Sequence, residues 1–105
     1  YDRTALIALP EDLRRRYVAK ITELCEPGAR ILLITLEYDQ NRMSGPPFSI
    51  TADMVTDYYG AEFQIEVVGQ KDDLDAISRA RAAGLESVRE SVYLLETLAP
   101  NIRDA

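Results

Sequence analysis

The residues best suited to chemistry in this chain fall into two short groups. Asp2 and Arg3 stand immediately before an apolar run, and Pro46 and Pro47 precede Phe48. An Asp–Arg pair can hold a polar ligand through charge-assisted hydrogen bonds, although an exposed surface pair is an ordinary alternative. Consecutive prolines fix the backbone and so aim the aromatic ring that follows them, either toward a ligand or into the core.

A third candidate is Arg79, in the segment that precedes Gly84. On the sequence pattern alone, a solvated helical face is the simplest explanation for it. Cys25 fits a small buried apolar residue better than a nucleophile, because the chain has no histidine to activate it. No catalytic triad, phosphate loop or metal-ligand spacing occurs in the sequence. We therefore predict no catalytic acid, base or nucleophile and no metal site.

The composition limits the partners of the chain. Among 105 residues, 12 Lys and Arg face 18 Asp and Glu, and the net charge of -6 leaves no broad basic field. This disfavours nucleic acid and anionic membrane surfaces as partners. No apolar run approaches the ~20 residues that span a bilayer. The single cysteine cannot form an internal disulfide, which predicts a cytoplasmic protein.

Two segments are expected to be helices. Residues 12–24 carry Leu13, Tyr17, Ile21 and Leu24 at helical spacing with charged residues between them, which predicts one buried stripe. Thr51 can cap a second helix that stops at Gly60, with its apolar side chains on one face. Residues 72–84 can add another helical turn or two. These helices must be packed against a sheet.

The strand pattern supplies that sheet. Residues 31–36 form a nearly uninterrupted apolar run, typical of a strand buried on both faces. The polar, proline-containing residues 39–50 follow as a long loop, and in open α/β sheets ligands bind at the carboxyl ends of strands. Phe63, Ile65 and Val67 alternate with polar residues, which predicts a half-buried strand.

Two segments stay open on periodicity alone. Residues 85–98 fit both helical and strand spacing, and the apolar run at residues 4–9 fits a buried strand or a short helix. The alternation of helix and strand indicates an α/β fold, but two or three strands are too few for a complete doubly wound sheet. Because the chain also starts at Tyr1, we expect the rest of the sheet to lie upstream.

Several motifs, taken in order, resemble the thiopurine S-methyltransferases, in particular the bacterial members. The motifs are Tyr1-Asp2-Arg3 with residues 5–10, residues 33–39 leading into Gly45-Pro46-Pro47-Phe48, Gly84-Leu85, and Tyr93-Leu94-Leu95. The likeness covers nearly the whole chain. The resemblance implies an enzyme of this family that uses S-adenosylmethionine and acts on a small thiol, selenium or tellurium compound.

The resemblance also implies the C-terminal half of a class I (Rossmann-like) methyltransferase sheet with flanking helices. Residues 30–39 would be its fifth strand, residues 62–69 its sixth, and residues 87–98 its seventh. The seventh would be antiparallel and inserted between the other two. Residues 4–9 would then be the turn or short helix after the fourth strand. In that case, residues 1–105 are the C-terminal part of one methyltransferase domain, and the N-terminal donor-binding half is absent.

The resemblance assigns Asp2 and Arg3 to the donor and Pro47, Phe48 and Arg79 to the acceptor. Because the donor-binding loop would precede Tyr1, the isolated chain is expected to be inactive. Its unpaired strand edge at residues 31–36 is expected to drive self-association. The alternatives are a non-catalytic interaction module and a methyltransferase with a different small-molecule acceptor, since a fold does not name its acceptor.

Overall fold

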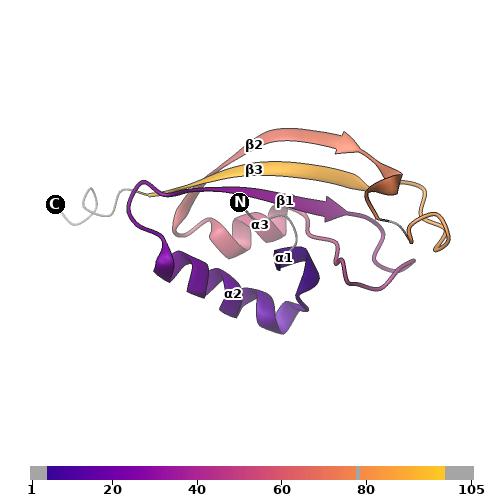
Figure 1. Cartoon of the computed structure of the whole chain (residues 1–105), viewed down its shortest axis with the longest axis horizontal. Helices are drawn as coiled ribbons and strands as arrows, with labels where there is room; N and C mark the ends of the chain where they lie inside the picture. The colour runs from indigo at the N-terminus through magenta and orange to yellow at the C-terminus, as the bar shows by residue number, and fades with distance from the viewer. Residues whose placement is uncertain (1–4, 78, 99–105) are drawn as a thin grey trace.

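The computed structural model of the chain describes residues 5–77 and 79–98. Within the described part of the chain, the helices lie against one face of a three-stranded sheet, below the sheet in Figure 1. The elements in chain order are α1 (Ala5–Ala8), α2 (Glu11–Leu24), β1 (Arg30–Glu37), α3 (Ala52–Tyr59), β2 (Phe63–Asp72), the 3₁₀ turn η1 (Leu74–Ala76) and β3 (Arg89–Thr97). The predicted α/β class is confirmed.

The last strand lies in the middle of the sheet. The order is β1-β3-β2, and β3 pairs antiparallel with both neighbours, so β1 and β2 run parallel to each other. The predicted antiparallel strand between the other two is therefore confirmed, and the helical alternative for residues 85–98 is wrong. In its central position, β3 forms backbone hydrogen bonds with a strand on each side. A helix in this place would leave the facing backbone groups of β1 and β2 without partners.

The core lies between the sheet and the helices. Leu33 of β1 pairs with Tyr93 of β3 in the register, and both side chains are almost fully buried. Val55 and Tyr59 of α3 pack in the same cluster, and Tyr59 meets the ring of Phe63 edge to face at 5.5 Å between centroids. Burial of this kind stabilises a side chain by roughly 1.5–3 kcal/mol, so packing, more than propensity, fixes these short elements.

Helix α2 differs from its predicted packing. Tyr17 and Ile21 contact the core as expected, but Leu13 is 39% and Leu24 68% exposed. Arg14 is buried instead, at 5% exposure. The buried face of α2 is therefore rotated by about one residue from the predicted apolar stripe. Arg14 can be buried there because its guanidinium has polar partners between the helices.

Four other boundaries are corrected. Residues 5–8 are helical, so the strand alternative there is wrong; Thr4 lies outside the described residues. After Asp72, which still belongs to β2, the described residues up to Gly84 form no helix except η1. The Asp73 carboxylate accepts from the N–H of Asp75, which closes a local turn. Strand β1 ends at Glu37, earlier than expected, and β2 runs beyond Gly69 after a register shift. None of the described helices is long and apolar enough to cross a membrane.

Candidate functional site

The loop that contains Pro46, Pro47 and Phe48 is held from three directions. Tyr38, just after β1, donates its hydroxyl hydrogen to the carbonyl oxygen of Pro47 at 2.6 Å. The backbone N–H of Phe48 donates to the carbonyl oxygen of Ile7 at 2.6 Å. Arg79 donates from Nη2 to the carbonyl oxygen of Pro46 at 2.6 Å. The loop is therefore fixed by residues from both ends of the described chain.

Gln40 ties the start of this loop to its end. Its Nε2 donates to the Tyr38 hydroxyl at 2.7 Å and to the carbonyl oxygen of Met43 at 2.8 Å. Its Oε1 accepts from the N–H of Ser49 at 2.9 Å, and the Ser49 hydroxyl accepts from the N–H of Tyr38 at 3.0 Å. Because each polar group in this network has a defined partner, the loop has a set shape without regular secondary structure.

One cavity of about 350 Å³ opens at the carboxyl end of β1. It is lined by Ile7, Ala8, Ile34, Leu36, Pro46, Pro47, Ala76 and Glu90. Apart from Glu90, every one of these side chains is apolar. A cavity of this size and lining suits a small flat or apolar ligand.

A second cavity, of about 630 Å³, is lined by the other end of the loop. Phe48 and Gly45 border it together with Arg14, Tyr38 and other residues of α2 and α3. The Phe48 ring lies under the guanidinium of Arg14, with the Arg14 Cζ 5.1 Å from the ring centroid. Pro47 and Phe48, adjacent in sequence, therefore line different cavities.

The structure brings three of the five predicted site residues together. Pro47, Phe48 and Arg79 all belong to, or bind, the same loop, and Arg79 also donates to the carbonyl oxygen of Ser44 at 3.2 Å. Asp2 and Arg3 lie outside the described residues, so the structure gives no donor contact for them. Within residues 5–77 and 79–98 there is no group of three His, Cys, Asp or Glu that could hold a metal ion.

Three residues with shifted pKa values lie outside the lining of the two cavities. Burial raises the pKa of the Tyr93 hydroxyl, on the helix-covered face of the sheet. On the surface, the hydrogen bond and the charge of Arg81 lower the pKa of Asp75, and Asp75 in turn raises the pKa of Arg81. None of these three residues lines either cavity.

A sequence model of the family thiopurine S-methyltransferase (TPMT) matches residues 1–98. The chain belongs to this family. Curated proteins named thiopurine S-methyltransferase from Pseudomonas syringae pv. tomato and Vibrio atlanticus are 45% and 40% identical to it, over 90% and 94% of the chain. A third from Methylococcus capsulatus is 38% identical over 94% of it. The matches take in 43% to 45% of these relatives, so the chain spans less than half their length.

The thiopurine S-methyltransferase match confirms the resemblance seen in the motifs, including the segment that holds Asp2 and Arg3. Sequence reasoning missed Tyr38, Gln40 and Arg14 as residues that shape the loop. Tyr38 and Gln40 directly follow the buried strand, which was a usable signal. Arg14 gave none, because it stands in a run of three arginines that reads as a solvated helical face.

Proposed function

We propose that this chain is the C-terminal part of an S-adenosylmethionine-dependent methyltransferase that acts on a small thiol or a selenium or tellurium acceptor. The observation that carries the proposal is an apolar cavity walled by Pro46 and Pro47 in a chain of the thiopurine S-methyltransferase family. The cavity lies at the carboxyl end of β1, where ligands of α/β folds bind.

In this proposal β1, β3 and β2 are the fifth, seventh and sixth strands of a class I (Rossmann-like) sheet. The antiparallel β3 between two parallel strands supports that assignment. Residues 1–105 are then the C-terminal part of one methyltransferase domain, and the N-terminal part carries the loop and the acidic residue that cradle the donor. The isolated chain is inactive on this account.

The donor, when bound, supplies an electrophilic methyl group on a sulfonium. In the proposal, Arg3 binds the carboxylate of the donor through its planar guanidinium, and Asp2 also belongs to the donor side. Both residues belong to the matched range but lie outside the described residues. The described residues serve the acceptor side.

Transfer of a methyl group to a soft nucleophile needs alignment and exclusion of water more than acid or base help. Ile7, Leu36 and Pro47 supply an apolar wall for this purpose. Arg79 cannot act as a base because its guanidinium stays protonated. Its positive charge, anchored on the carbonyl oxygen of Pro46, favours the anionic form of an acceptor next to that wall.

Phe48 is proposed to contribute to the acceptor side as well. Its ring lines the second cavity, so it acts on the acceptor through the loop it shares with Pro47. A flat aromatic thiol matches the apolar lining of the first cavity, while compact selenium or tellurium compounds need less of its volume.

Calorimetry with S-adenosylhomocysteine tests the proposal against its rival. The complete protein should bind it saturably at micromolar concentration, and residues 1–105 alone should not. A non-catalytic interaction module, which the family match does not favour, predicts no binding to either. Saturable binding to residues 1–105 alone would contradict the division of the domain, and binding to neither would contradict the function. We further expect a cytoplasmic protein with a small-molecule substrate.

A further inference from the structure

We propose that Arg14 is a positioning residue for the acceptor pocket, which it shapes by holding the ring of Phe48. The inference rests on the proposed function. It adds a residue of α2 that does not line the cavity formed by Pro46 and Pro47. Its basis is the unusual environment of this arginine.

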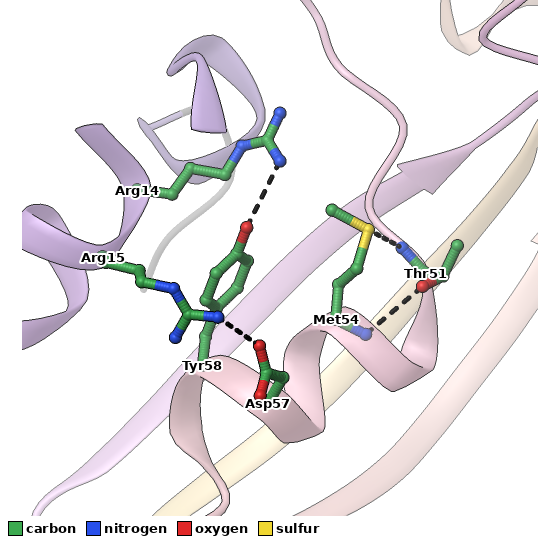
Figure 2. A network of polar contacts seen from close by, with 6 residues as sticks. All are labelled: Arg14, Arg15, Thr51, Met54, Asp57 and Tyr58. Atoms are coloured by element: carbon green, nitrogen blue, oxygen red, sulfur yellow. Dashed lines mark hydrogen bonds and ion pairs between the residues drawn. The ribbon is translucent and has the colours of Figure 1, made fainter. Parts of the chain in front are cut away.

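Arg14 is a buried cation with neutral partners. Its side chain is 5% exposed, and Nε donates to the carbonyl oxygen of Leu9 at 2.8 Å. Nη1 donates to the hydroxyl of Tyr58 in α3 at 3.3 Å, the bond drawn between the two helices in Figure 2. Among residues 5–77 and 79–98, no carboxylate forms an ion pair with it. A buried charge of this kind is costly unless something else compensates it.

The face of Phe48 supplies that compensation. The guanidinium lies 5.1 Å from the ring centroid, within the range of a cation–π contact, and desolvation strengthens such a contact. The planar guanidinium also covers the ring sterically. Arg14 therefore gains a partner in the loop, and the loop gains a fixed orientation for its aromatic ring.

Packing of the two helices does not depend on Arg14 alone. Its neighbour Arg15 pairs with Asp57 of α3 and lies over the ring of Tyr58 at 5.2 Å (Figure 2). The side chains of Arg15 and Asp57 are each 63% exposed, so this pair is a surface contact. Because a second link joins α2 to α3, the role of Arg14 can be separated from helix packing.

The ring of Phe48 transmits its position to the cavity. It folds back over Gly45, where an added Cβ would lie 2.6 Å from the ring Cγ, so the two ends of the four-residue segment touch. Pro46 and Pro47 between them line the 350 Å³ cavity. On the other side, Arg14 and Phe48 border the 630 Å³ cavity, which gives the ring room to swing if the guanidinium is removed. A displaced ring would shift the prolines and widen the acceptor site.

The test compares Arg14→Met, Arg14→Lys, Tyr58→Phe and Arg16→Met in the complete protein. Removing the guanidinium should raise KM for an aromatic thiol by about two- to tenfold, the scale of one partly desolvated cation–π contact. The dissociation constant of the donor should not change. Arg14→Lys keeps the charge but not the planar fork, so it should recover only part of the effect. Arg14→Lys also tests the inference if Arg14→Met does not fold.

Tyr58→Phe and Arg16→Met are the matched controls. Tyr58→Phe removes a hydrogen bond of Arg14 without touching Phe48, and Arg16 is an exposed arginine on the same helix. Both should leave KM within twofold. An equal rise in KM with Tyr58→Phe would overturn the inference, because it would trace the effect to general packing of α2 and α3.

Fluorine NMR of 4-fluorophenylalanine at Phe48, assigned by loss of its signal in Phe48→Leu, separates this inference from the proposed function. The resonance should move in Arg14→Met and stay in Tyr58→Phe. If the wild-type protein transfers no methyl group, the proposed function fails while a moved resonance still supports the Arg14–Phe48 coupling. An unmoved resonance in Arg14→Met and Arg14→Lys would overturn it.

Discussion

Arg79 and Pro46 are joined by a 2.6 Å hydrogen bond from Nη2 to the carbonyl oxygen, although 33 positions separate them in sequence. The bond ties the segment after η1 to the loop after β1. It places a fixed positive charge beside the proline wall of the apolar cavity. The acceptor side of the proposed enzyme is therefore built by a contact between two segments that have no regular secondary structure.

Replacing Arg79 tests this arrangement. In the complete protein, Arg79→Ala should lower turnover of acidic thiols about tenfold, the loss expected for one charge-assisted contact worth roughly 1.5 kcal/mol. Arg3→Ala should instead weaken donor binding, measured by calorimetry. Arg81→Ala is the control, since Arg81 pairs with Asp75 on the surface. The site assignment fails if Arg79→Ala and Arg3→Ala both leave activity within twofold.

The contact between Gly45 and Phe48 gives a second prediction. Because a Cβ at position 45 would overlap the Phe48 ring, Gly45→Ala should displace the ring and raise KM for the acceptor. Gly69→Ala is matched to it, since a Cβ at position 69 meets nothing within 4 Å. Steady-state kinetics of both variants would check this. Equal KM values for the two would show that the loop tolerates the methyl group.

Helix α3 gives a prediction about stability. The Thr51 hydroxyl accepts from the N–H of Met54 at 3.2 Å and caps the helix (Figure 2). Thr51→Ala should lower the free energy of unfolding by about 1 kcal/mol. Urea denaturation measures it, with the exposed Thr56→Ala in the same helix as control. A loss equal to that of Thr56→Ala would mean that the cap contributes nothing.

The edge of β1 predicts self-association of the isolated chain. β1 is an outer strand of the described sheet and pairs with β3 on one side. On β1, the carbonyl oxygen of Leu36, near the end of the strand, also accepts a hydrogen bond from the N–H of Ile50. An apolar edge of this kind recruits other chains. Sedimentation at several concentrations should show dimers or larger species, reduced by Leu32→Lys.

Val68→Lys on the opposite outer strand, β2, is the control for that experiment, because Val68 is already 47% exposed. It should leave the association unchanged. If Val68→Lys dissociates the dimers or larger species and Leu32→Lys does not, the chains associate through β2 instead of β1. A dilution-independent monomer of the wild-type chain would contradict the prediction altogether.

Local patterns predicted most elements of this fold. The helix over residues 52–59 and the strands beginning near residues 30 and 63 follow from spacing and caps that neighbouring residues determine. Residues 85–98 needed the family resemblance, because their helical and strand spacings coincide. Only the middle position of β3 in the sheet decides between the two.

The contacts that build the candidate site could not be predicted in the same way. Arg14 and Arg16 are alike in the sequence, yet Arg14 is buried over the ring of Phe48 and Arg16 is exposed. The difference depends on which face of α2 packs against Phe48 and α3, which no local pattern encodes. Arg79 likewise reaches Pro46 only because β2, which precedes it, runs parallel to β1 and ends at the same end of the sheet. The residue types therefore indicated the candidate site residues, but long-range packing determines which residues they contact.

The most direct test is transfer of an isotopically labelled methyl group from S-adenosylmethionine to an aromatic thiol by the complete protein. The account predicts a methylated thiol whose formation saturates with both substrates and is inhibited by S-adenosylhomocysteine. Residues 1–105 alone should yield none above background. If the complete protein, folded and able to bind the donor, methylates no thiol, selenium or tellurium compound, the proposed acceptor chemistry is wrong.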